Sequence, residues 1–194
     1  MRVFISDLDG TLVHVPVNWL EVRRALSNAL GFEVTSIFEA LRNVRARNEK
    51  LYRRLSRLIE DYEVNAMRNL EEIKGSKELL RRLKSMGVRI AIVTLQSEKS
   101  LKMALDVSGL TPYVDVYVTR DEELNRAKQI KIALRKLGAE VGRDLIVFMG
   151  DRQTDLEAGR SLGIPTIIVN SITFTPLDAI NVIAENLRLH GDQT

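Results

Sequence analysis

The sequence contains no cysteine and only two histidines, His14 and His190, among its 194 residues. Without cysteine the chain forms no disulfide bond, no thiolate metal site and no cysteine nucleophile, and two distant histidines argue against a multi-histidine metal site. No stretch is apolar over the roughly 18 residues that a membrane span requires. The N-terminus leads directly into a strand pattern without the basic and apolar parts of a signal peptide, so we expect a soluble cytoplasmic protein.

The composition is that of an ordinary globular protein, with 45% hydrophobic and 28% charged residues, which is enough apolar material for a sizeable core. The length predicts one domain, or one core with a modest insertion. The net charge of +3 and the isoelectric point of about 9.3 are too mild to indicate nucleic-acid binding, but they favour anionic substrates. We therefore expect neither a nucleic acid nor a membrane as a partner.

The chain opens with a short apolar run, Val3–Ile5, which is followed by two acids, Asp7 and Asp9, and then by Gly10. Apolar runs that end in this way are typical of a buried strand in an α/β sheet. Side chains at positions i and i+2 of a strand point to the same face, roughly 7 Å apart. We therefore expect both carboxylates at the carboxyl end of the strand, where open α/β sheets bind their ligands, with Gly10 permitting a sharp turn.

From residue 75 onward, apolar strand patterns alternate with helical patterns. Strands are predicted at residues 88–93, 114–118, 145–149 and 165–169, and helices at 76–86, 97–109, 127–137, 154–162 and 176–189. This alternation implies a parallel sheet with right-handed crossovers. The predicted fold class is therefore α/β, with a Rossmann-like parallel sheet and helices on both of its faces.

Residues 14–74 are helical in pattern, contain no predicted strand, and lie between the first two predicted strands. We expect them to form an all-helical cap inserted into an α/β core of residues 1–13 and 75–194. Apolar positions from residue 37 to residue 62 recur at spacings of three and four, which predicts one long helix. Asn48 is the single polar member of this seam.

Residues 42–58 hold seven basic side chains and one acid, Glu49. Such a run is usually a solvated helix face, and the alternative is a basic wall that attracts phosphorylated substrates or polyanions. The apolar seam likewise fits either helix packing inside the cap or a dimerising coiled coil. Both a monomer and a homodimer therefore stay open.

Polar groups follow three of the predicted strands, and these groups are Asp7 with Asp9, Thr94, and Asp151 with Asp155. Asp151 and Asp155 are spaced i, i+4 across a strand-to-helix turn, so both can face the same pocket. Four uncompensated carboxylates near one point would repel one another and raise their pKa values. A hard dication resolves this repulsion, and Mg²⁺ typically binds one or two carboxylates together with phosphate and water. The set of charges therefore predicts a Mg²⁺ site.

The remaining polar groups suit phosphoryl transfer. Thr94 and the backbone amides at the start of the next helix can hold phosphate oxygens, and Lys128 can supply positive charge to the phosphoryl group. One carboxylate can attack phosphorus and form an aspartyl phosphate. A second acid two residues later can protonate the leaving oxygen and then activate water.

In order and chemistry these residues resemble the four motifs of the haloacid dehalogenase-like (HAD) phosphohydrolases, which match Asp7-Leu8-Asp9-Gly10-Thr11, Thr94, Lys128, and Gly150-Asp151 with Asp155. The resemblance implies that Asp7 is the nucleophile and Asp9 the general acid/base. It also implies a Mg²⁺ site built from Asp7, Asp151 and the backbone carbonyl of Asp9, with Asp155 as a water-mediated or more distant ligand. Thr94 and Lys128 are expected to bind phosphate, with Lys128 also contacting Asp7, and Gly10 and Thr11 complete the expected substrate-binding residues.

The position of the helical insertion and the core together look most like phosphoglycolate phosphatases and their relatives. This resemblance implies a Mg²⁺-dependent phosphatase that hydrolyses a small phosphorylated metabolite through an aspartyl-phosphate intermediate. Two alternatives stay open, namely a phosphomutase of the same fold and a catalytically weak regulatory module that binds phosphate or metal.

The sequence departs from the family pattern at two positions. The residue after Thr94 is Leu95 where relatives usually have asparagine, so a contact near the phosphate is lost or is supplied by a neighbour, Gln96 or Ser97. The residue after Lys128 is Gln129 where relatives usually have proline. The approach of Lys128 to the site is therefore open, and Lys131 competes with it for the role of phosphate-binding lysine.

Overall fold

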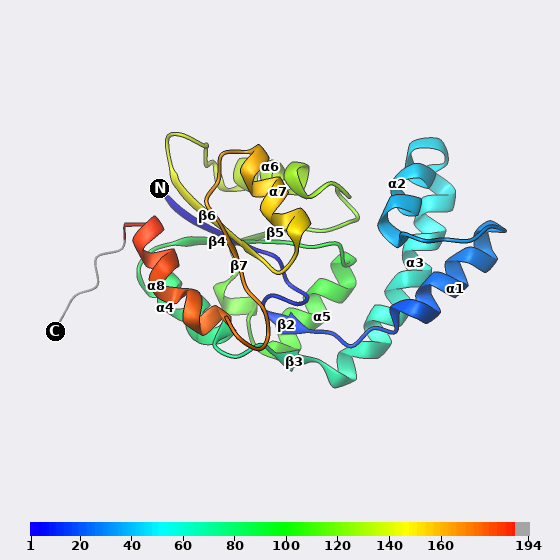
Figure 1. The fold of residues 1–194 in the computed structure, drawn as a ribbon, viewed down its shortest axis with the longest axis horizontal. Coiled ribbons are helices and arrows are strands. Elements are labelled where there is room, and N and C mark those ends of the chain that lie inside the picture. Colours follow the sequence, from blue (N-terminus) through cyan, green and yellow to red (C-terminus); the bar gives the residue numbers. More distant parts are fainter. Residues whose placement is uncertain (189–194) are drawn as a thin grey trace.

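Five parallel strands form the central sheet of the computed structural model, which describes residues 1–188 (Figure 1). In spatial order they are β5 (Val116–Val118), β4 (Arg89–Val93), β1 (Arg2–Ser6), β6 (Leu145–Gly150) and β7 (Thr166–Ile168). This sheet confirms the predicted α/β fold class, although β5 and β7 are shorter than expected. The predicted helix at 176–189 ends at Asn186, while Leu189 and His190 lie outside the described residues.

The first strand of the chain lies in the middle of the sheet. Ser6 of β1 is paired with Ile92 of β4 on one side and with Met149 of β6 on the other. Central parallel strands are buried on both faces, which explains why β1 is almost continuously apolar. The three strands therefore end at the same level, and the residues that follow them meet at one edge of the sheet.

Helices cover both faces of the sheet (Figure 1). On one face lie α6 (Arg126–Leu137) and α7 (Gln153–Ser161), and on the other lie α4 (Ser76–Ser85), α5 (Glu98–Ser108) and α8 (Pro176–Asn186). Successive residues of a strand point to opposite faces. Val3 and Ile5 accordingly belong to one buried apolar cluster, and Phe4 between them belongs to the other.

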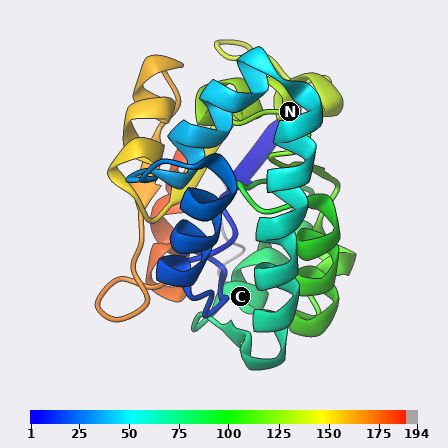
Figure 2. The same cartoon turned by 90° about the vertical axis from the view of Figure 1, so that its right-hand side faces the viewer.

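Three further helices stand beside the sheet, α1 (Trp19–Leu30), α2 (Ile37–Arg47) and α3 (Glu49–Ala66), followed by a short 3₁₀ turn, η1 (Met67–Asn69) (Figures 1 and 2). We call residues 19–69 the helical segment. Its two ends are joined by a short antiparallel pair, β2 (Val13–His14) and β3 (Glu71–Glu72). The prediction that residues 14–74 contain no strand is therefore wrong at the two ends of this range. Strands of two residues are too short to give a periodic pattern in the sequence.

The prediction of one long helix through residues 37–62 is also wrong, because the chain breaks at Asn48. This residue has an extended backbone, with φ −152° and ψ 91°, and its Oδ1 accepts a hydrogen bond from the Leu51 amide at 2.9 Å. Asparagine at this position satisfies one of the free N–H groups at the start of a helix. The polar member of the seam therefore begins α3, so that α2 and α3 fold back and pack against each other.

A fully buried ion pair joins the helical segment to the core. Glu63 of α3 and Arg120, which follows β5, have side chains that are 0% exposed, and Nη1 of Arg120 lies 2.5 Å from Oε1 of Glu63. The guanidinium also donates to the Ser56 hydroxyl at 2.9 Å and to the Leu95 carbonyl at 2.9 Å. Oε2 of Glu63 accepts from the Ser97 amide at 3.3 Å. These bonds tie α3 to the loops that follow β4 and β5.

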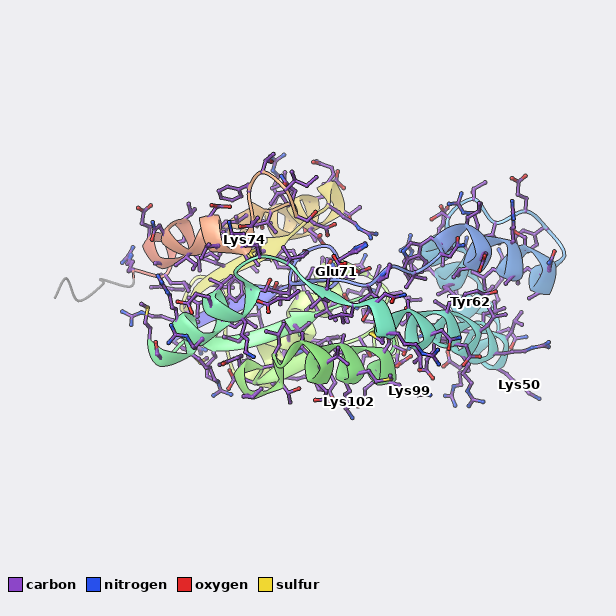
Figure 3. The ribbon with its side chains drawn as sticks, turned by 90° about the horizontal axis from the view of Figure 1, so that it is seen from below. Lys50, Tyr62, Glu71, Lys74, Lys99 and Lys102 are labelled. Carbon is purple, nitrogen blue, oxygen red and sulfur yellow. The ribbon has the colours of Figure 1, made fainter. Side chains whose placement is uncertain are left out.

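The basic residues of α3 face mostly outward. Lys50, Arg53, Arg54 and Arg57 are exposed, and Figure 3 shows Lys50 at the outer end of the helical segment. Arg45 of α2 differs, because its guanidinium donates a hydrogen bond to the backbone carbonyl of Arg120 at 3.3 Å. The same guanidinium lies over the Tyr52 ring, 4.8 Å from its centroid. Within residues 1–188, no helix has both the length and the apolar character needed to cross a bilayer.

Replacing Arg120 with methionine should lower the free energy of unfolding by about 3–5 kcal/mol, because it leaves the Glu63 carboxylate buried without its partner. Urea unfolding followed by circular dichroism measures this loss. Arg89→Met is the matched control, because Arg89 is 46% exposed in its ion pair with Asp115 and such surface pairs contribute about 1 kcal/mol or less. The double variant Glu63→Gln with Arg120→Met should lose less than Arg120→Met alone. Equal losses in Arg120→Met and the control would contradict the importance of the buried pair.

Candidate active site

Asp7 occupies the first position after the central strand. Its backbone amide still donates to the Met149 carbonyl of β6 at 2.9 Å, so the sheet fixes its position, and the residue is only 4% exposed. Gly10 follows with φ +84°, and a Cβ at this position would overlap the carboxylate of Asp151. Glycine therefore supplies both the turn and the space for Asp151.

Three carboxylates meet at this edge of the sheet. Asp7, Asp151 and Asp155 each offer an oxygen, and these oxygens lie within 4.8 Å of one another. Asp151 follows β6, and Asp155 lies in the first turn of α7, where its Oδ2 accepts from the Arg152 amide at 3.2 Å. The structure thus brings together three of the four acids that the sequence singled out, drawn from both ends of the chain.

The pKa values of two of the clustered carboxyls, Asp7 and Asp151, are raised. Burial raises the pKa of Asp7 to about 7, Arg126 opposes this rise, and the neighbouring carboxylates of Asp155 and Asp151 add to it. Burial likewise raises the pKa of Asp151. Each of these carboxyls is therefore harder to ionise than an exposed aspartate, as expected for acids that share one site.

The donor set fits a hard divalent cation. Mg²⁺ prefers carboxylate oxygens and needs few protein ligands, and three such oxygens converge here. Oδ1 of Asp155 is buried and accepts no well-aligned hydrogen bond from the described residues, although Nε of Arg126 lies 2.8 Å away. Arg152, which is 54% exposed, lies 3.8 Å from Asp151. A cation at this position would compensate the charge that Arg126 and Arg152 leave unbalanced, so the residues present are compatible with Mg²⁺.

Asp9 lies beside the cluster and has a different environment. Its Oδ1 accepts a hydrogen bond from the Val15 amide at 2.8 Å, which leaves Oδ2 to carry or accept a proton. Burial raises the pKa of Asp9, while the Val15 hydrogen bond opposes the rise. The side chain of Asp9 is not among the three clustered carboxylates, so any contribution of this residue to a metal site would come through its backbone carbonyl.

The cationic side chain in contact with Asp7 is Arg126, which was not predicted from the sequence. Nη2 of Arg126 lies 2.9 Å from Oδ1 of Asp7. Lys128, the predicted residue, is exposed, and it lines a separate cavity of 540 Å³ together with Lys131. The expected contact of Lys128 with Asp7 is therefore absent from the described structure. Residues on a helix are spaced by about 100°, so a side chain two positions after Arg126 points away from Asp7.

Gln129 is the second residue whose role the sequence did not reveal. It lies three positions after Arg126, on the same face of α6, and its Oε1 accepts from Nη1 of Arg126 at 3.0 Å. Its Nε2 donates to the carbonyls of Thr94 at 2.7 Å and Glu123 at 2.8 Å. Gln129 therefore holds Arg126 and Thr94 together, whereas the sequence analysis treated it only as a departure. The signal for Arg126 was its position at the start of α6, directly after the helix-capping Asn125.

A small cavity of about 30 Å³ lies over these groups, and its walls come from both the core and the helical segment. It is lined by Asp7, Asp9, Trp19, Phe38, Glu63, Thr94, Leu95, Gln96, Arg126 and Arg152. Thr94 is 1% exposed and lines this cavity, and its role in phosphate binding stays a prediction. The buried Thr11 directs its Oγ1 toward Asp151 at 3.5 Å instead of lining this cavity.

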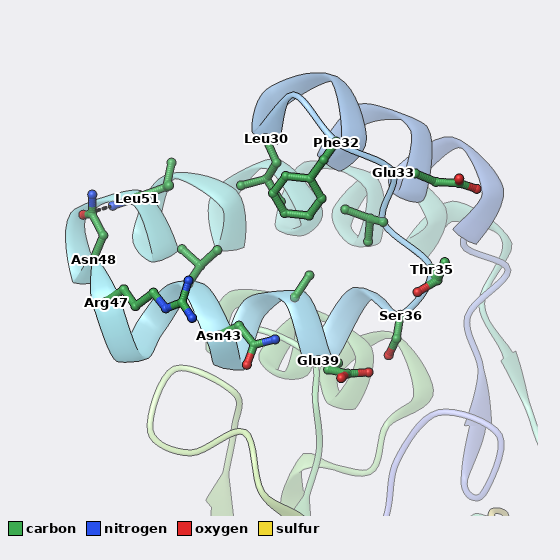
Figure 4. Close-up of a pocket in the computed structure, with 13 residues that line it drawn as sticks. Leu30, Phe32, Glu33, Thr35, Ser36, Glu39, Asn43, Arg47, Asn48 and Leu51 are labelled. Atoms are coloured by element: carbon green, nitrogen blue, oxygen red, sulfur yellow. Dashed lines mark hydrogen bonds between the residues drawn. The ribbon is translucent and has the colours of Figure 1, made fainter.

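The helical segment has a second cavity, of 460 Å³, between the loop after α1 and helices α2 and α3 (Figure 4). Its polar wall includes Glu39, Asn43 and Arg47, and Figure 4 shows these side chains on α2. The acids of the cluster do not line it. The chemistry of the site therefore belongs to the smaller cavity at the edge of the sheet.

Comparisons with known proteins agree with this geometry. Residues 4–169 match the family model described as haloacid dehalogenase-like hydrolase. A phosphoglycolate phosphatase of Aquifex aeolicus is 32% identical, covering 87% of this chain and 84% of the relative. One of Rhodospirillum rubrum is 26% identical, covering 87% of this chain and 79% of the relative. Among solved structures, a hydrolase from Pseudomonas syringae matches with a TM-score of 0.74 at 20% identity, over 95% of this chain and 98% of the other.

Binding of Mg²⁺ should release a proton from Asp7. With a pKa of about 7, roughly nine-tenths of the Asp7 carboxyl is protonated at pH 6 and roughly one-tenth at pH 8, and a metal ligand must be deprotonated. Calorimetric titration in two buffers of different ionisation enthalpy should therefore show nearly one proton released per ion at pH 6 and little at pH 8. The Asp7→Asn variant is the control and should show a much smaller release. Identical heats in both buffers at pH 6 would contradict the raised pKa.

Proposed function

The chain belongs to the haloacid dehalogenase-like hydrolases and is a phosphoric monoester hydrolase, and we propose that it is a Mg²⁺-dependent phosphatase that acts through an aspartyl phosphate on Asp7. The observation that carries the proposal is the cluster of Asp7, Asp151 and Asp155 at the end of the central strand, with Arg126 against Asp7. This set combines a nucleophilic oxygen with compensating positive charge in a buried cavity.

Asp7, Asp151 and Asp155 would hold the ion, with the backbone carbonyl of Asp9 as a further donor. A bound Mg²⁺ keeps Asp7 ionised and neutralises charge on the phosphoryl group. Oδ1 of Asp7 is occupied by Arg126, so the oxygen that attacks phosphorus is Oδ2.

The reaction has two steps. In the first, the Asp7 carboxylate forms a bond to phosphorus, the bond to the alcohol oxygen breaks, and Oδ2 of Asp9 gives its proton to that oxygen. In the second, Asp9 accepts a proton from a water molecule, whose oxygen bonds to phosphorus. The bond from phosphorus to Asp7 then breaks, and inorganic phosphate leaves. The raised pKa of Asp9 suits the first step, because the acid must be protonated before it can donate.

Arg126 and Thr94 would bind the phosphate oxygens. Arg126 lies beside Asp7 with its side chain 12% exposed. Its Nη1 donates to the Val93 carbonyl and to Gln129, its Nη2 donates to Asp7, and its Nε lies 2.8 Å from Asp155, so a phosphate oxygen would meet the second N–H of Nη2 in a charge-assisted hydrogen bond. Gln129 fixes Arg126 and the Thr94 carbonyl, so the two groups keep their spacing. We assign to Arg126 the role that the sequence gave to Lys128.

The helical segment would act as the cap, since Trp19, Phe38 and Glu63 form its part of the cavity wall. The phosphoglycolate phosphatases among the relatives make short phosphomonoesters the first substrates to test. Release of inorganic phosphate separates this activity from a phosphomutase of the same fold.

Asp7→Asn should abolish Mg²⁺-dependent turnover of p-nitrophenyl phosphate, because the neutral amide cannot attack phosphorus. The rate of phosphate release with and without Mg²⁺ measures this. Asp144→Asn is the control, because Asp144 is an aspartate at the opposite end of the sheet, bound to the N-terminal amine at 2.7 Å. Retained turnover in Asp7→Asn would rule out the nucleophile assignment.

Arg126→Ala should lower kcat/KM by about 100-fold or more, which is the usual effect of removing one donor to the developing charge. Lys128→Ala, two positions away on the same helix, should stay within about twofold of the wild type, because Lys128 is exposed. Steady-state kinetics on one phosphomonoester compares the two variants. A larger loss in Lys128→Ala than in Arg126→Ala would restore Lys128 as the phosphate-binding residue.

A further inference from the structure

Gln96 is a buried amide without a hydrogen-bond partner. It lies two residues after Thr94, is 3% exposed, and lines the same cavity as Asp7. Both its Nε2 and its Oε1 are buried and find no partner among the described residues. Burying polar groups in this way is unfavourable, and a leucine would fill the same space without that penalty. The side chain is therefore best explained by a ligand that supplies both missing partners.

The two ends of the amide restrict what this ligand can be. Nε2 donates hydrogen bonds and Oε1 accepts them. A hydroxyl group does both, so it can pair with either end of the amide. A carboxylate is an acceptor only, and it would leave Oε1 facing another oxygen. The chemistry of Gln96 therefore favours a hydroxyl over a carboxylate.

The cavity wall contributed by the helical segment also favours a leaving group without a carboxylate. Trp19 and Phe38 meet edge to face, with ring centroids 6.1 Å apart and an interplanar angle of 63°. Glu63, the third residue from this segment, is an acid whose charge is balanced by Arg120. This wall carries no basic residue, because Arg126 and Arg152, the cations of the cavity, come from the core. A leaving group on this side meets aromatic faces and a carboxylate, which suit a neutral molecule.

We propose that Gln96 binds the leaving group and selects phosphomonoesters of small neutral alcohols that carry a further hydroxyl group, in preference to those that carry a carboxylate. This inference rests on the proposed phosphatase activity and adds its substrate class. The cavity leaves little free space between the core and the helical segment, so small leaving groups are the ones to test first. Gln96 also lies next to the position where the family places an asparagine, which here is Leu95.

Three short esters of matched size test the proposal. 2-Hydroxyethyl phosphate and 2-phosphoglycolate differ only in a CH₂OH group against a carboxylate, and propyl phosphate replaces the hydroxyl with a methyl group. The wild-type protein with Mg²⁺ should show a kcat/KM for 2-hydroxyethyl phosphate that is about tenfold or more above the values for the other two. An equal or higher value for either of the others would overturn the proposal.

Gln96→Leu tests whether the preference comes from the amide. The variant should turn over 2-hydroxyethyl phosphate and propyl phosphate with nearly equal kcat/KM, with most of the loss on the hydroxyl substrate in KM. It should unfold at the same urea concentration as the wild type or a higher one, because it removes a buried unpaired group. Gln153→Leu is the matched control, because Gln153 is exposed, and it should keep the wild-type preference. A Gln96→Leu variant that keeps the preference would overturn the assignment.

Hydrolysis of p-nitrophenyl phosphate distinguishes a failure of the proposed phosphatase activity from a failure of the role proposed for Gln96. Mg²⁺-dependent hydrolysis of this ester with no preference for the hydroxyl substrate would leave the proposed function standing and refute the role of Gln96. No hydrolysis of any ester would refute the proposed function and this inference with it.

Discussion

Repulsion among three carboxylates is the constraint around which this protein is built. Asp7, Asp151 and Asp155 come from opposite ends of the chain, and their oxygens lie within 4.8 Å of one another. The pairing of β1 with β6 makes this possible, because the two strands end at the same level. Arg126 balances part of the charge, and the remainder creates the demand for a cation. Without a bound cation this repulsion lowers the stability of the fold, and the same repulsion favours the binding of one.

The sheet and the acids could be predicted from the sequence because both are local. An apolar run shows a buried strand, and the residue after its end is placed by the strand itself, so Asp7, Thr94 and Asp151 were found from pattern alone. The basic side chain that pairs with Asp7 could not be predicted in this way. Arg126 and Lys128 are two positions apart at the start of one helix, and only the rotation of α6 on the sheet decides which of them faces Asp7. Asn48 posed a similar difficulty. The apolar residues on both sides of it keep helical spacings of three and four, although the chain breaks between α2 and α3 at this residue, whose side chain caps α3 with a single hydrogen bond.

The helical segment was predicted in outline, but its attachment to the core was not. A pair such as Glu63 and Arg120, 57 residues apart, leaves no mark in the local pattern, since each residue alone looks like an ordinary surface charge. Buried ion pairs are poor sources of net stability compared with apolar packing. Their geometry is specific, however, and this pair reaches the Leu95 carbonyl and the Ser97 amide. The helical segment is therefore bonded to the loop that carries Gln96, so that the two walls of the cavity have a defined spacing.

Two buried glutamines, Gln129 and Gln96, stand at or beside the two departures from the family pattern and have opposite consequences for the fold. Gln129 replaces a proline, and every polar atom of its side chain is used, by Arg126, Thr94 and Glu123. Gln96, in the loop where an asparagine is missing, uses none. A satisfied buried amide can be explained by the structure it holds together, whereas an unsatisfied one makes that structure less stable. The contrast between the two glutamines therefore distinguishes a residue that holds the site together from one whose partners a bound substrate would supply.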